Sequence, residues 1–175
     1  MRNNIAFINN QQGERLEMHE DIVQEFQEYF QDTLREPSGS RNQAIQNIVQ
    51  HIPKIINDDH NNRLLQPISL QEVEEAMAQL KDGKAPGPNG FTANFFHTFW
   101  EHIKKEVWEL MDESRLMYWV LPSLNTTFIA LIPKVEESKT PDKYRAIALC
   151  NVIYKLISKV AENRLKPLLS LLIFP

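Results

Sequence analysis

Residues 126–150 read TTFIALIPKVEESKTPDKYRAIALC. The run at 126–134 is short and rich in β-branched and aromatic side chains, and the run at 144–150 is short and alternates, so both runs favour β-strands. The segment between them is charged and contains Pro141, as is typical of a loop. This stretch therefore predicts a small antiparallel β-hairpin.

Two cations lie at the ends of the predicted strands. Lys134 ends the first strand and Arg145 begins the second, so a closed hairpin places both near the base of its loop. Arginine binds phosphate through two N–H groups and lysine supplies a point charge. The pair therefore suits a triphosphate or a nucleic-acid backbone, and a solvated basic face is the alternative.

Helices are predicted on both sides of the hairpin. Residues 151–169 place apolar side chains on one side, and Asn151 is a candidate N-cap. Residues 92–118 carry a wide stripe that is expected to anchor the core, because aromatic side chains bury large areas. The stripe consists of Phe95, Phe96, Phe99, Trp100, Ile103, Val107, Leu110 and Met111.

The segment KDGKAPGPNGF, residues 81–91, separates this helix from an earlier one. Ser69 and Glu72 fit a capping box at the start of the earlier helix, and Gly83 is expected to stop it in the left-handed conformation. The remaining glycines and the two prolines of 81–91 predict a stiff bend between the helices.

The first sixty residues predict two more helical segments. An amphipathic helix is expected over 14–35, ended by the sequence EPSGS at 36–40, and a second apolar series spans 44–52. The sequence NDDHNN at 57–62 is polar and predicts a loop rather than a metal site. Together these elements predict an α+β fold that is mostly α-helical, with one small antiparallel β-hairpin.

Composition narrows the class of protein. Cys150 is the one cysteine in 175 residues, so no disulfide can form within the chain. No apolar run reaches the roughly 18–20 residues that a membrane helix needs, and the first residues do not resemble a secretory signal. These features predict a protein of the nucleus or cytoplasm with no membrane partner.

Charge is distributed unevenly along the chain. Residues 1–125 hold 11 Lys and Arg against 19 Asp and Glu, a net charge of −8, whereas residues 126–175 hold 8 against 4, a net charge of +4. A basic C-terminal part can meet a polyanion. The overall pI of about 5.7 argues against strong non-specific binding.

Several of these segments occur together in a known family. KDGKAPGPNGF (81–91), FFHTFWEHIKKEV (95–107) and the block at 128–169 resemble the reverse transcriptases of non-LTR (LINE-type) retrotransposons, especially plant copies. The resemblance covers about residues 64–170. It implies that residues 64–175 are the N-terminal fingers part of a right-hand polymerase, truncated before the palm, and that 1–63 are a helical segment preceding it.

The resemblance also implies roles for residues. Lys134 and Arg145 match the lysine and arginine that lie near the phosphates of the incoming dNTP, and Lys139 and Lys143 would lie near the RNA or DNA template or the nucleotide. The family's catalytic carboxylates, which hold two Mg²⁺ ions for phosphoryl transfer, lie downstream of this block. We therefore expect no catalytic residue, metal ligand or cofactor in this chain, with Mg²⁺ needed by the full-length enzyme.

The sequence departs from the family pattern at two places. Asn89 stands where the family usually has aspartate, and Ala146 stands where proline usually follows the arginine. These departures, with the apolar ending LLSLLIFP, suggest a decayed or truncated element copy. Three interpretations follow: an inactive polymerase fragment, a non-catalytic module that binds RNA or a partner, and a product without function.

Overall fold

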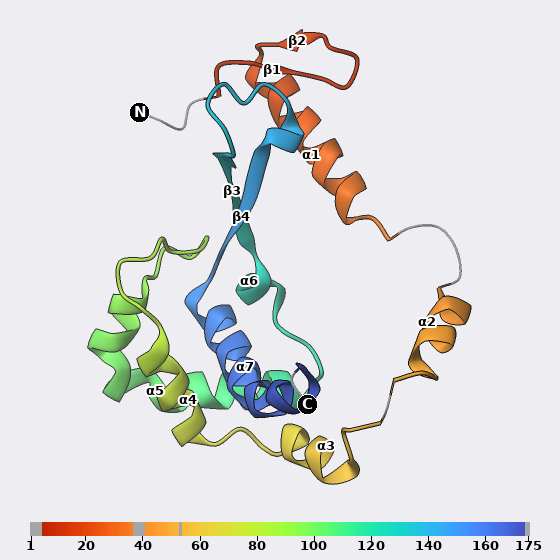
Figure 1. The fold of residues 1–175 in the computed structure, drawn as a ribbon. Helices are drawn as coiled ribbons and strands as arrows, with labels where there is room; N and C mark the ends of the chain where they lie inside the picture. Colours follow the sequence, from red (N-terminus) through yellow and green to blue (C-terminus); the bar gives the residue numbers. More distant parts are fainter. Residues whose placement is uncertain (1–4, 37–40, 53, 174–175) are drawn as a thin grey trace. The chain divides into compact units, whose positions relative to one another are not determined.

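The computed structural model describes residues 5–36, 41–52 and 54–173 (Figure 1). The chain is mostly helical and has two small antiparallel sheets of two strands each, so the predicted α+β class is confirmed. It divides into two compact units, one formed by Met1–His51 with Ile129–Ala148 and the other by Ile52–Phe128 with Leu149–Pro175. The predicted functional boundary between residues 63 and 64 stays a prediction. None of the described helices is both long and apolar enough to cross a membrane.

The first unit contains two hairpins and two longer helices. Its elements are β1 (Ile8–Asn9), β2 (Arg15–Leu16), α1 (His19–Leu34), α2 (Asn42–Val49), most of β3 (Thr127–Pro133), the short 3₁₀ helix η1 (Pro141–Lys143) and most of β4 (Tyr144–Cys150). The hairpin predicted from residues 126–150 is confirmed, since β3 and β4 form one sheet.

The start of α1 differs from the prediction. Residues 14–18 do not join the helix, because β2 pairs there with β1 and Leu16 lies opposite Ile8. The Asn10 side chain accepts hydrogen bonds from the backbone N–H groups of Gln12 and Glu14, which shapes the intervening turn. Periodicity alone did not predict this N-terminal hairpin.

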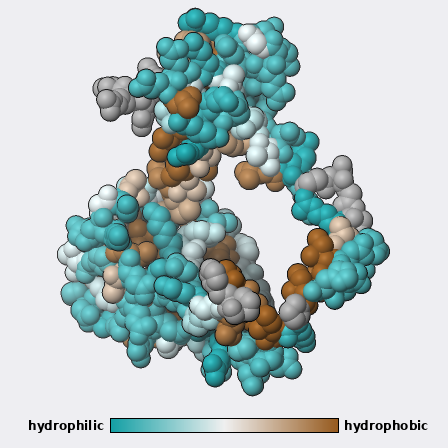
Figure 2. All heavy atoms as spheres, in the orientation of Figure 1, coloured by the Kyte–Doolittle hydropathy of each residue, from teal (hydrophilic) through white to brown (hydrophobic). Residues whose placement is uncertain are grey.

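A small apolar cluster holds the first unit together. Ile8, Ile22, Phe26 and Tyr144 are buried in it, and the rings of Phe26 and Tyr144 meet edge to face with centroids 5.1 Å apart. The helix α2, predicted from the apolar series at 44–52, has no buried residue. Figure 2 shows apolar atoms exposed along this part of the chain, where Ile45, Ile48, Val49 and Ile52 lie.

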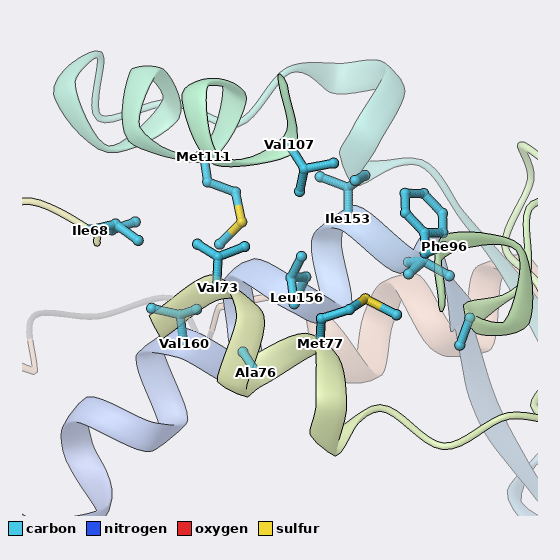
Figure 3. Packing of buried hydrophobic residues seen from close by; sticks show 12 residues of the cluster. Ile68, Val73, Ala76, Met77, Phe96, Val107, Met111, Ile153, Leu156 and Val160 are labelled. Carbon is cyan, nitrogen blue, oxygen red and sulfur yellow. The ribbon is translucent and has the colours of Figure 1, made fainter. Parts of the chain in front are cut away.

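The second unit is built from helices. Its elements are α3 (Asp58–Leu65), α4 (Leu70–Gln79), α5 (Ala93–Leu116), α6 (Pro122–Asn125) and α7 (Val152–Ile173). Their apolar faces form the larger core, in which Val73 and Leu156 are fully buried and Met111 is almost so. In Figure 3, Met111 of α5 points toward Val73 of α4, with Leu156 of α7 beside them.

The capping box that starts α4 is confirmed. The Ser69 hydroxyl accepts a hydrogen bond from the Glu72 N–H (3.2 Å), and the Glu72 carboxylate accepts one from the Ser69 N–H (2.9 Å). Gly83 has the expected positive φ of 74°, but α4 already ends at Gln79, so Gly83 shapes the turn that follows rather than stopping the helix.

Two further predictions for this unit are wrong. The segment 57–62 is not a loop, because the Asn57 side chain caps α3 by accepting the His60 N–H, and Asp58 and Asp59 favour the first turn through the helix dipole. Phe99 is not part of the buried stripe, since it is 46% exposed and contacts the neighbouring Phe95 ring.

Candidate nucleic-acid interface

The base of the β3–β4 loop is closed by a lysine. The Lys134 N–H donates to the Lys143 carbonyl over 2.8 Å, and the Lys134 ammonium donates to the Asp142 carbonyl over 2.7 Å. The structure therefore brings Lys134 beside the end of the loop, next to Lys143. This position follows from strand pairing, which the sequence predicts.

The loop has an internal hydrogen-bond network. The Ser138 hydroxyl donates to the carbonyls of Val135 (2.8 Å) and Lys143 (3.2 Å), and the Tyr144 hydroxyl donates to the Ser138 carbonyl (2.9 Å). The Thr140 hydroxyl and then the Lys143 ammonium hold the pKa of the Asp142 carboxyl below its usual range. These contacts give the loop one preferred shape.

All four predicted cations lie on the surface of this hairpin. Lys139 pairs with Glu137 at 3.2 Å and Lys143 with Asp142 at 2.9 Å. Arg145 has no ion-pair partner among the residues described. Exposed ion pairs contribute about 0–1 kcal/mol, so a phosphate group can replace these carboxylates at little cost.

The hairpin is less basic than its cations suggest. Residues 134–145 hold four cations and three acids (Glu136, Glu137 and Asp142), so their net charge is +1. Such a surface can bind phosphate through a few directed contacts. It cannot act as a broad polyanion-binding face. The net charge of +1 predicts a modest affinity for nucleic acid, which falls as the salt concentration rises.

Arg164, one of the basic residues of the C-terminal part, is largely buried and makes its contacts within the second unit. Its side chain is 14% exposed and makes two hydrogen bonds to the Glu72 carboxylate, at 2.7 and 2.9 Å. The guanidinium also donates to the carbonyls of Leu64, Gln66 and Pro67. Chiefly because of the Arg164 hydrogen bond, the pKa of Glu72 falls to about 2. Arg164 therefore does not add to a nucleic-acid surface.

The 81–91 segment is a structural bend. A Cβ atom on Gly87 would lie 2.4 Å from the Asn151 backbone nitrogen and 2.5 Å from the Cys150 carbonyl carbon, so glycine is required by space. The Asn89 side chain accepts the Phe91 N–H (3.1 Å), and Thr92 caps α5.

Asn151 connects three segments of the second unit. It is 1% exposed, and its side-chain oxygen accepts the Asn89 N–H at 3.1 Å. Its amide nitrogen donates to carbonyls on either side of the α6 end, those of Ser123, Leu124 and Thr126. The sequence predicts Asn151 as a cap, but its side chain binds these distant backbone groups. In the sequence, the indication of a structural role for Asn151 is its position between the second predicted strand and the following helix.

The described residues offer no metal site. Within residues 5–36, 41–52 and 54–173, no three His, Cys, Asp or Glu side chains gather closely enough to hold an ion. The residues present thus do not fit the Mg²⁺ pair that the family resemblance implies for the full-length enzyme.

Comparison with known proteins shows a similarity to a transposon protein. No protein-family model matches the sequence. An uncharacterized 149 kDa protein of transposon TX1 from Xenopus laevis is 25% identical over 174 residues. The match covers 99% of this chain but 13% of that protein, so the chain spans a small part of the relative's length. The similarity supports a transposon origin for this sequence.

Proposed function

We propose that this chain is part of the fingers of an RNA-directed DNA polymerase encoded by a non-LTR retrotransposon. In this proposal the β3–β4 hairpin contacts the template or the incoming dNTP through Lys134, Arg145, Lys139 and Lys143. The chain contributes binding in this proposal, and the metal-dependent step belongs to the carboxylates that the family resemblance places downstream of this block.

One observation carries the proposal. Lys134, whose ammonium is held at the base of the loop, and Arg145, at the start of the next strand, lie on one exposed hairpin. Transposon similarity over almost the whole chain and the family resemblance at 128–169 agree with this assignment.

Binding of a labelled single-stranded RNA tests the proposal. We expect fluorescence anisotropy to report binding at 50 mM KCl that weakens as salt rises. The double substitution Lys134→Ala/Arg145→Ala should weaken binding about tenfold, and the slope of log affinity against log salt should become shallower by about 1.4, or 0.7 per phosphate contact on a single strand.

The matched control removes two exposed cations that lie outside the hairpin. Lys54→Ala/Lys81→Ala changes the net charge of the chain by the same amount, so it should leave most of the affinity. Absence of RNA binding at low salt would refute the proposal, as would equal losses in the two double variants.

A further inference from the structure

We infer that the N-terminal hairpin and α1 are positioning elements for the cation-bearing loop, and that the Asn9 N–H and the Phe26 ring set the place of Lys139. The consequence for nucleic-acid binding rests on the proposed function. The resemblance assigns residues 1–63 to a segment outside the fingers, so this role is not part of that assignment.

The first support is a backbone hydrogen bond. The Asn9 N–H donates to the Lys139 carbonyl over 2.6 Å. Asn9 also pairs with Arg15 in the N-terminal hairpin, so the donor is fixed by a sheet of its own. The tip of the β3–β4 loop is therefore attached, at the residue that carries the cation, to a segment 130 positions earlier in the chain.

The second support is an aromatic contact. Tyr144 is 7% exposed, and the edge-to-face contact with Phe26 of α1 fixes its ring. The same tyrosine donates its hydroxyl to the Ser138 carbonyl, one residue before Lys139. The position of α1 is thus transmitted through one ring to the loop backbone.

The surroundings of Lys139 agree with this role. Phe7, Val135 and Lys139 line a shallow cleft between the N-terminal segment and the loop. The Lys139 side chain is on the surface and pairs with Glu137 alone among the described acids. Its direction therefore depends on the backbone anchor rather than on side-chain packing.

Hydrogen exchange tests the anchor without any ligand. Asn9→Pro removes the N–H donor, whereas Asn9→Ala keeps it and removes only the side chain. We expect Asn9→Pro to speed exchange of the amides within 134–143 by about three- to tenfold, the ratio that corresponds to one lost hydrogen bond. Asn9→Ala should leave them unchanged. The amides of α5 serve as a control region and should be protected equally in the two variants. Equal exchange of the 134–143 amides in Asn9→Pro and Asn9→Ala would then overturn the inference.

A double-mutant cycle tests the functional consequence. If Asn9 acts by placing Lys139, Asn9→Pro should weaken RNA binding about threefold or more in the parent chain, yet have no further effect in a Lys139→Ala background. The Phe26→Leu variant should show the same non-additivity with Lys139→Ala. Additive losses would show that the N-terminal segment contributes only general stability and would overturn the inference.

The two proposals fail in different ways. If the parent chain binds no RNA, the proposed function fails, while the exchange experiment still decides whether the anchor exists. If RNA binds and Asn9→Pro leaves both affinity and exchange unchanged, the proposed function stands and the positioning role is wrong.

Discussion

Gly87 and Asn151 show how single residues fix the bend between α4 and α5. The loop backbone passes so close to the β4–α7 junction that no side chain fits at residue 87. The side chain of Asn151, which is itself 1% exposed, then makes hydrogen bonds to four backbone groups from these segments. A buried polar group without a hydrogen bond costs about 1–3 kcal/mol, so this small cluster matters for the whole second unit.

Replacing Gly87 with alanine should destabilise the protein by about 2–3 kcal/mol, because the new methyl group would overlap backbone atoms that cannot move aside. Urea denaturation measures the change. Gly83→Ala is the matched control, since Gly83 has open space around it and a positive φ that strains alanine but not glycine, and it should cost about 1 kcal/mol. A smaller loss at Gly87 than at Gly83 would contradict this explanation.

Asn151→Asp should cost about 3 kcal/mol at pH 7, although aspartate has nearly the same shape. Its carboxylate cannot donate to the three carbonyls that the amide group contacts, and it places a negative charge against them. Asn125→Asp, on the surface of the same unit, should change the free energy of unfolding by less than about 0.5 kcal/mol. Similar denaturation midpoints for the two variants would disprove the donor role.

At the scale of elements, Arg164 connects α7 to the start of α4 and to the segment before it. A guanidinium suits this place, because its planar fork reaches a carboxylate and several carbonyl oxygens together. Removing one partner of such a pair is costly, since the other charge is left partly buried. The contact explains why the pKa of the capping-box residue Glu72 lies at about 2, well below its ordinary value.

This pair predicts acid sensitivity. The pKa of Glu72 is lower in the folded chain (about 2) than its ordinary value of 4.5. Its contribution to stability is therefore complete above pH 4.5 and is lost as the pH falls toward 2. Because the carboxylate is 33% exposed, we expect the loss to be about 2 kcal/mol rather than the full value of the shift.

The measurement compares urea denaturation midpoints at pH 7, 4.5 and 2.5. Glu72→Gln should be less stable than the parent chain at pH 7 and should lose less stability on acidification. Glu113→Gln, on the exposed face of α5, should follow the parent chain at each pH. A pH dependence in Glu72→Gln as steep as in the parent would assign the acid sensitivity to other groups.

Helices and strands were predictable from the sequence where a single apolar face or a single capping motif determines them. The hairpin strands, the α4 capping box and the long aromatic helix follow from local pattern, and the structure confirms each. The α3 helix was missed because its sequence is polar and its stability comes from the Asn57 cap and the Arg164 contact. The β1–β2 hairpin was missed because its strands have two residues each, too few to show alternation.

The candidate site was predictable only in part. Charge and strand order indicated that Lys134 and Arg145 share a hairpin. The Asn9 anchor and the internal use of Arg164 depend on contacts between residues far apart in the chain, which no local pattern contains. The acids that pair with Lys139 and Lys143 are their sequence neighbours Glu137 and Asp142, but the pairing itself depends on the folded shape of the loop.

At the scale of the whole molecule, the purified 175-residue chain should not extend a primer. With a DNA primer annealed to an RNA template, dNTPs and Mg²⁺, we expect no elongated product on a denaturing gel, because the family resemblance places the catalytic carboxylates downstream of the matching block. A retroviral reverse transcriptase serves as the positive control. Metal-dependent extension by the chain alone would show that it holds a catalytic centre of its own.

The first unit joins two parts of the chain that are made at different times. Residues 52–128 separate them, and a ribosome adding about 5–20 residues per second needs roughly 4–15 s to synthesise that interval. During this time Ile22 and Phe26 have been translated while Tyr144, their buried neighbour, has not. The apolar side of α1 therefore lacks this buried neighbour until residue 144 has been synthesised. During that time we expect it to be a binding site for chaperones.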